Sequence, residues 1–179
     1  MTAQHHVRAD YDDRTIVVYQ AQAYAPAVAG PALRANRFVP PFSFRWLTHR
    51  SNRARKPGRE RILAVRITRA GWEAALASAV PTTAGPAAVA KAPVQVQWDP
   101  ERSLRGAALN HYSIQVGVGR TFAEEWVVGL SDLTPRVQRI AALRQDGRSA
   151  QAQRLLPPER IHPVPPASDV DAERLGIDV

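Results

Sequence analysis

Five segments of the chain carry the hydrophobic pattern of β-strands. They are residues 14–20, 61–68, 94–98, 112–118 and 126–130, each rich in Val and Ile or alternating between apolar and polar side chains. A period of two is typical of strands with one buried and one solvated face. In the third segment Gln95 and Gln97 separate Val94, Val96 and Trp98, so we expect one apolar and one polar face there.

Helical patterns are fewer. Helices are predicted over residues 68–80, 134–147 and 149–156, and a further one over residues 26–36. Thr68 and Thr134 stand where a hydroxyl side chain caps a helix, and Pro135 suits the first helical turn. Strands mixed with a few helices, without an internal repeat, predict an α+β fold with a mostly antiparallel sheet.

The length of 179 residues predicts a single domain with a sizeable core. We expect this domain to span residues 8–158. Residues 159–179 contain prolines followed by acidic residues, and this composition predicts an extended or disordered tail that folds back over the basic part of the chain. Residues 81–93 are small and include prolines, so we expect a surface loop there.

Composition limits the kinds of site and the compartment. The chain has no cysteine, which excludes disulfides, thiolate metal sites and cysteine nucleophiles. The five histidines are scattered, so we expect no metal site. The first residues lack the apolar segment of a signal peptide, and no run approaches the roughly 18 apolar residues of a membrane span. We therefore expect a cytoplasmic protein without membrane association; the pattern leaves the oligomeric state open.

Positive charge is concentrated between Arg34 and Arg69. This stretch holds 11 basic residues against the single acid Glu60, a net charge of +10, whereas the whole chain carries +8. Such a block favours phosphate-bearing partners: RNA, DNA or the pyrophosphate of a nucleotide. The alternative is a general preference for arginine in this chain, because the aromatic residues between Phe38 and Trp46 precede the densest charge rather than alternate with it.

Four sequence blocks resemble a known family in their content and order. They are residues 8–11 with 16–21, residues 37–44, residues 96–102, and residues 113–115 with 125–128. Together they resemble the bacterial domain of unknown function 4291, and the resemblance covers residues 8–158. The chain departs from that pattern where Phe44 runs almost directly into Trp46, where His49 replaces an aromatic residue before Arg50-Ser51, and where Tyr112 replaces an arginine.

A second resemblance implies a chemistry. A strand ending in Tyr19-Gln20 and a later strand headed by Glu125 are similar to the corresponding segments of ADP-ribosyltransferases and RNA 2′-phosphotransferases. The resemblance implies an ADP-ribosyltransferase-like fold, NAD as cofactor and Glu125 as the catalytic carboxylate. Such a carboxylate would stabilise the positive charge that builds on the ribose when nicotinamide leaves.

The same resemblance implies the residues that hold the cofactor. Gln20 stands where that superfamily has a histidine, and its amide would grip the ribose with Tyr19 nearby. Arg50 or a neighbouring arginine would bind the pyrophosphate, for which a bidentate guanidinium is suited. Ser113 and Gln115 lie two apart on a strand, so both would face the same cleft.

Each of these assignments has a structural alternative. Glu125 would then be one of two carboxylates at a solvated strand end, Tyr19 a core residue and Arg50 a surface arginine. Two hypotheses for function follow. One is an NAD-dependent transferase that acts on RNA or another phosphate-bearing acceptor. The other is a non-enzymatic module that binds nucleic acid or a nucleotide through the basic stretch from Arg34 to Arg69.

Overall fold

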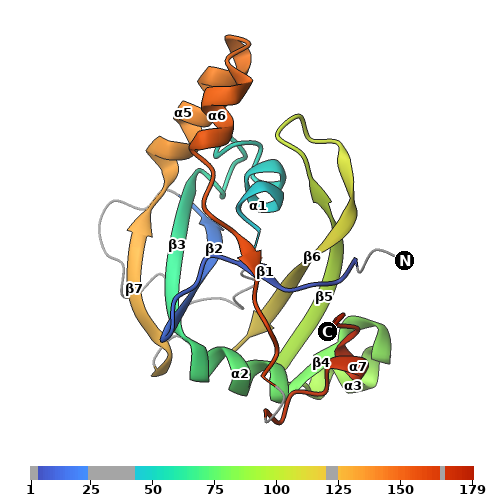
Figure 1. Cartoon of the computed structure of the whole chain (residues 1–179). Coiled ribbons are helices and arrows are strands. Elements are labelled where there is room, and N and C mark those ends of the chain that lie inside the picture. The colour runs from blue at the N-terminus through green and yellow to red at the C-terminus, as the bar shows by residue number, and fades with distance from the viewer. Residues whose placement is uncertain (1–3, 24–42, 120–124, 166–167) are drawn as a thin grey trace.

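The computed structural model describes residues 4–23, 43–119, 125–165 and 168–179. Two three-stranded sheets form its frame (Figure 1). The first sheet has the order β2 (Thr15–Gln22), β3 (Arg61–Thr68) and β7 (Val127–Asp132). The second has the order β4 (Ala79–Pro81), β5 (Val94–Arg102) and β6 (Ala108–Val118). A short pair, β1 (Arg8–Ala9) and β8 (Arg160–Ile161), crosses in front of them.

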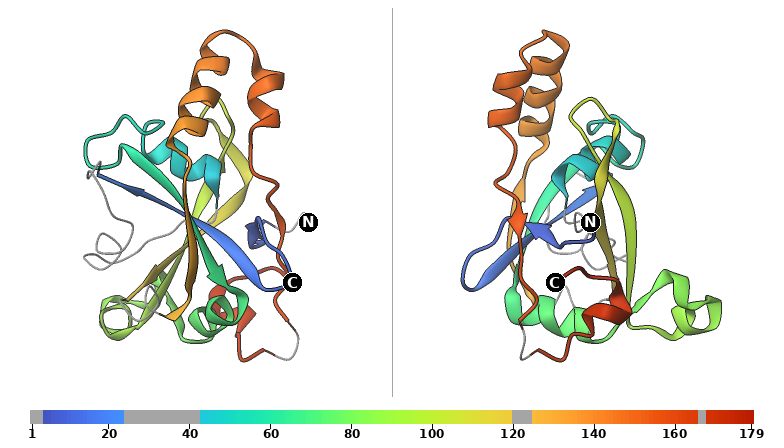
Figure 2. Two further views of the ribbon diagram at one scale, coloured as in Figure 1. Left: turned by 90° about the vertical axis from the view of Figure 1, so that its left-hand side faces the viewer. Right: turned by 45° about the vertical axis from the view of Figure 1, so that its right-hand side comes forward.

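All strand pairs within these sheets are antiparallel except β4 and β5, which run parallel. The helices are α1 (Phe44–Arg50), α2 (Arg69–Ala77), α3 (Pro86–Lys91), α5 (Thr134–Gln145), α6 (Ser149–Arg154) and α7 (Ala172–Leu175). Helices α5 and α6 project together beyond one end of the sheets, whereas α2 closes the other end (Figure 2). The predicted α+β fold with mostly antiparallel sheets is confirmed.

Two hydrophobic cores lie on opposite faces of the first sheet. Alternation along β2 divides its residues between them: Ile16 and Val18 join the larger core, and Val17 and Tyr19 join the smaller one. The larger core also takes the apolar faces of β5 and β6 and the buried Trp72 of α2. The smaller core lies under α1, α5 and α6. Helix α1 is therefore fixed by apolar packing against the first sheet.

The five predicted strands are present, and most of them are longer than predicted. The helix predicted over residues 68–80 ends at Ala77 because the next residues pair with β5 as strand β4. Thr68 caps this helix as predicted, since its Oγ1 accepts a hydrogen bond from the N–H of Gly71 at 3.1 Å. Thr134, predicted as a cap, is the first residue of α5; its Oγ1 accepts from the N–H of Ile62 at 3.0 Å.

Two segments predicted to be irregular contain short regular elements. Residues 81–93, expected to form a surface loop, contain a 3-10 turn (Thr82–Ala84) and helix α3. The tail, expected to be extended or disordered, supplies β8 and α7 and places Leu175 and Ile177 in the larger core. Burial of these two apolar residues stabilises the tail. The many prolines and acidic residues of the tail gave no indication of this burial. The helix predicted over residues 26–36 lies outside the described residues.

Candidate functional site

A polar cleft of about 690 Å³ opens beside α1, between the end of β2 and the strands β5 and β6. Its lining residues are Gln20, Ala21, Gln22, Ala23, Trp46, Leu47, His49, Arg50, Gly58, Arg59, Gln97, Asp99, Pro100, Arg102 and Gln115. Polar and charged side chains dominate this list, whereas the neighbouring cores are apolar. A cleft of this volume is large enough for a nucleotide-sized molecule.

The register of β5 and β6 explains why the floor of the cleft is polar. Gln97 pairs with Gln115, and Asp99 pairs with Ser113, directly across the two strands. Their apolar neighbours in the sequence, such as Ile114, face the larger core on the other side of the sheet. Because side chains alternate along a strand, the four polar residues emerge together on the face toward the cleft.

Helix α1 provides the wall of the cleft. It begins at Ser43, whose Oγ accepts a hydrogen bond from the N–H of Trp46 at 3.1 Å. The N–H of Phe44 donates to Oε1 of Glu159 at 2.7 Å, which ties the start of the helix to the tail. Trp46 is buried on the core side, and the Arg50 guanidinium lies over its ring at 5.5 Å from the centroid. The helix is thereby held in an orientation that presents Arg50 to the cleft.

The charge of the cleft is positive. Its described lining includes the guanidinium groups of Arg50, Arg59 and Arg102, whereas the carboxylate of Asp99 is the one acidic side chain among them. Partial burial, followed by the positive charge of Arg102 and its arginine neighbours, lowers the pKa of His49. The imidazole is therefore neutral near pH 7 and adds no charge of its own. The positive potential favours an anionic ligand.

Three buried polar atoms in and beside the cleft have no hydrogen-bond partner among the described residues. They are Oε1 of Gln20, Nε of Arg102 and Oγ of Ser113. A buried polar atom without a partner costs about 1–3 kcal/mol. A bound molecule that offered a hydroxyl or amine to Gln20 and an anionic oxygen to Arg102 would recover part of that free energy.

Three of the five predicted cofactor-binding residues meet in this cleft. Gln20, Arg50 and Gln115 all line it, although they come from β2, α1 and β6. Ser113 is buried beside Gln115 on the same face of β6. Tyr19 does not reach the cleft: it is 1% exposed in the smaller core, and its ring meets that of Phe44 edge-on with centroids 5.6 Å apart. The side chains of Tyr19 and Gln20 face opposite sides of β2, and that of Tyr19 is enclosed in the smaller core.

Glu125 lies at the other end of the first sheet. Gln20 is level with Asp132, the last residue of β7, because β2 and β7 both pair antiparallel with β3. Thr15, at the start of β2, pairs with Thr68, whose N–H donates to the carbonyl of the residue that follows Glu125. Five strand residues separate the two levels, which is roughly 16 Å. The exposed Glu125 is therefore not brought together with Gln20.

The basic residues predicted to form one face are divided in the structure. On the first sheet, Arg61 forms an ion pair with Asp132 at 2.9 Å, and Arg66 forms one with Asp12 at 3.2 Å. On α1 and just after it, Arg50 and Arg59 line the cleft, whereas Arg45 and Arg53 line a neighbouring pocket. Residues 34–42 of the stretch lie outside the described residues. Among the described residues of this stretch, the positive charge that could bind an anionic ligand is thus concentrated around α1.

Several lining residues were missed by the sequence interpretation. Asp99 lies just beyond the strand predicted over residues 94–98, but β5 continues to Arg102 and carries Asp99 into the cleft. The signal that could have found it was the polar alternation through Gln95, Gln97 and Asp99. His49 and Arg59 had no comparable signal, since they lie on a helix and just after a turn whose positions depend on tertiary packing.

The described residues include neither a metal-binding cluster nor a membrane-spanning helix. Among them, no group of three or more His, Asp or Glu side chains could hold a metal ion. Within the same part of the chain, no helix is both long and apolar enough to cross a membrane.

The two sheets and the cleft between them define a single-domain α+β protein. Residues 6–162 match the family described as a domain of unknown function (DUF4291), and the chain belongs to this family. The match confirms the resemblance drawn from the four sequence blocks. No curated protein and no solved structure matches the chain, so the similarity to ADP-ribosyltransferases gains no support from the comparisons.

Proposed function

We propose that the protein binds a phosphate-bearing nucleotide in the cleft beside α1. One observation carries this proposal: three arginines and four glutamines line one cleft of about 690 Å³ that has a single carboxylate in its described lining. Guanidinium groups bind phosphate oxygens in bidentate geometry, and glutamine amides both donate and accept hydrogen bonds to sugar hydroxyls and bases. The pairing of these two side-chain types is suited to a nucleotide.

Arg50, Arg59 and Arg102 would hold the phosphates in this proposal. Arg50 already stacks on Trp46, so little of its side-chain freedom remains to be lost on binding. Arg102 has its Nε buried without a partner among the described residues, which leaves a donor for a phosphate oxygen. A ligand with two phosphates would use more of these charges than a monophosphate, and this favours a diphosphate.

The amide side chains would hold the nucleoside. Oε1 of Gln20 is buried without a partner in the described part of the chain and would accept a hydrogen bond from a ribose hydroxyl or a base amine. Gln97 and Gln115 face the same cleft from paired positions on β5 and β6. This set of residues fits NAD, the cofactor implied by the resemblance, as well as simpler nucleoside diphosphates.

Isothermal titration with ADP tests the proposal, beside adenosine and inorganic phosphate. Arg50→Gln removes a hydrogen bond to a charged phosphate, which is typically strong enough for about a tenfold loss of affinity or more. Gln20→Ala removes a hydrogen bond between neutral groups, so its loss of affinity should be smaller, up to about tenfold. Tyr19→Phe is the matched control, since it changes the neighbouring residue on the opposite face. Equal affinity for ADP in all four proteins, or no binding to the wild type, would contradict the proposal.

A second candidate function is cleavage of the nicotinamide–ribose bond of NAD, favoured by Asp99 in the cleft. In this reaction nicotinamide leaves with the bonding electron pair, and the oxygen of water or another acceptor bonds to the ribose carbon and loses its proton to solvent. The Asp99 carboxylate would stabilise the positive charge on the ribose during the exchange. The sheet register supports Asp99 in this role rather than Glu125, which lies roughly 16 Å along the sheet from Gln20.

Nicotinamide release by the purified wild type, Asp99→Asn and Glu125→Gln tests this second function. We expect release that is lost in Asp99→Asn and kept in Glu125→Gln. Loss in Glu125→Gln alone would contradict the assignment of Asp99. Absence of release by a wild-type protein that binds ADP would reject the cleavage reaction and leave nucleotide binding in place.

A further inference from the structure

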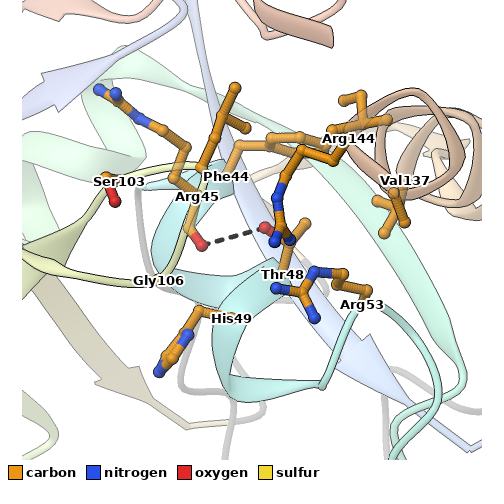
Figure 3. A pocket seen from close by; sticks show the side chains of 12 residues that line it. Phe44, Arg45, Thr48, His49, Arg53, Ser103, Gly106, Val137 and Arg144 are labelled. Carbon is orange, nitrogen blue, oxygen red and sulfur yellow. Dashed lines mark hydrogen bonds between the residues drawn. The ribbon is translucent and has the colours of Figure 1, made fainter. Parts of the chain in front are cut away.

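A second pocket lies between α1, the turn that joins β5 to β6, and α5 (Figure 3). Arg144 extends into it from α5 and Arg53 from the turn after α1, and His49 borders both this pocket and the cleft. Phe44 and Val137 form part of its apolar wall. The enclosed volume is about 30 Å³, which is room for a small group rather than for a whole nucleotide.

The two guanidinium groups carry uncompensated charge. No carboxylate is found among the described residues that line the pocket, and within the described residues neither Arg53 nor Arg144 forms an ion pair. Partial burial and then the nearby charge of Arg144 lower the pKa of Arg53. Like charges held this close, against an apolar wall, destabilise the folded protein unless an anion lies between them.

The backbone that carries Arg53 is strained. Asn52, Arg53 and Ala54 all have left-handed φ angles, 48°, 55° and 61°, although none of them is glycine. Each such residue costs roughly 1–2 kcal/mol. Several hydrogen bonds hold the turn; among them, the N–H of Arg53 donates to the carbonyl of Thr48 at 2.7 Å, and the buried Ser51 Oγ accepts from the N–H of Ala54 at 3.3 Å. The strained turn therefore lowers the stability of the fold, and it directs the side chain of Arg53 toward the pocket.

We propose that this arginine pocket is an anion site that binds one phosphate group between Arg53 and Arg144. Two guanidinium groups that converge from a turn and a helix match the oxygens of a phosphate, and the apolar wall strengthens the attraction by excluding water. The space admits a single phosphate, either a free ion or the terminal group of a larger molecule. This site is separate from the cleft, and the proposal does not depend on nucleotide binding there.

Thermal unfolding with added inorganic phosphate, at constant ionic strength set with chloride, tests the site. Ligand that binds the folded state raises the Tm. We expect phosphate to raise the Tm of the wild type, and we expect Arg53→Gln and Arg144→Gln to weaken the apparent phosphate affinity about tenfold or more. Arg139→Gln, on α5, is the matched control because its side chain is exposed.

The Tm measured without phosphate separates a role in anion binding from a merely structural role of the two arginines. Without phosphate, Arg144→Gln should melt at the same temperature as the wild type or higher, because it removes the like-charge repulsion with Arg53. A titration with ribose 5-phosphate shows whether a terminal phosphate enters as the free ion does. An equal phosphate response in the wild type and in Arg144→Gln would overturn the proposal, as would the absence of any response in the wild type. The Gln20→Ala variant should keep the full response.

Discussion

Replacing Glu159 by Gln should remove most of the loss of stability that the protein suffers between mildly acidic and mildly alkaline pH. Glu159 joins the tail to α1 by accepting the Phe44 N–H at 2.7 Å. Burial, reinforced by the negative charge of the buried Glu101, raises the pKa of Glu159 from 4.5 to about 8. The carboxyl is therefore protonated in the folded protein and ionised in the unfolded chain across this interval.

The sign and size of the effect follow from that shift. Unfolding releases a proton from Glu159 between pH 4.5 and about 8, so the contribution of this residue to stability is greatest below pH 4.5 and falls until the pH passes the folded pKa. At about 1.4 kcal/mol for each pKa unit, the complete shift corresponds to about 5 kcal/mol. The side chain is only half-buried and borders a cavity of about 210 Å³ that water can enter. Screening by that water reduces our expected loss to about 2 kcal/mol.

Urea unfolding followed by tryptophan fluorescence at about pH 5.5 and about pH 8.5 measures this difference. In the Glu159→Gln variant the amide oxygen still accepts the Phe44 N–H, so the variant keeps the tie between the tail and α1 while losing the titration. The exposed Glu173→Gln is the control and should retain the wild-type dependence on pH. The same pH dependence in the wild type and in Glu159→Gln would refute the reasoning.

Two further predictions concern the packing around Gly71 and the decrease of stability at acid pH. Gly71→Ala should destabilise the protein by about 1–3 kcal/mol, measured by urea unfolding, because the added Cβ would collide with the Trp126 side chain; Gly119→Ala, with open space around it, should change little. Burial lowers the pKa of His162 from 6.5 to about 4, so between these pH values the unfolded chain binds a proton that the folded protein does not. The contribution of His162 to stability is therefore complete above pH 6.5 and is lost as the pH falls toward 4. His162→Phe should reduce this decrease at acid pH by about 1–2 kcal/mol, and an unchanged decrease would contradict this cause.

The strands were predictable because their pattern is local. Alternation in residues 94–98 and the Val- and Ile-rich run of residues 61–68 each specify a strand without reference to the rest of the chain. The structure of the tail could not be predicted from such a local pattern. Leu175 and Ile177 are two apolar residues among prolines and acids, and only the larger core, built from distant strands, gives them a place to be buried.

The site was predictable only in part, because it depends on how strands pair. Gln20, Arg50 and Gln115 were singled out from separate segments, and they do line one cleft. Glu125 was grouped with them since both it and Gln20 stand at strand ends. Strand direction and register determine which ends meet, and these follow from contacts across the fold rather than from local sequence. The antiparallel register through β3 places the two at opposite ends of the first sheet.

A crystal structure of the protein grown with ADP tests nucleotide binding in the cleft most directly. The account predicts density for the diphosphate beside Arg50 and Arg102, with the ribose or the base within hydrogen-bonding distance of Oε1 of Gln20. Density for ADP elsewhere on the protein, such as beside Glu125 at the far end of the first sheet, would contradict the account. A cleft without ADP density, in crystals grown at concentrations that saturate binding in solution, would contradict it equally.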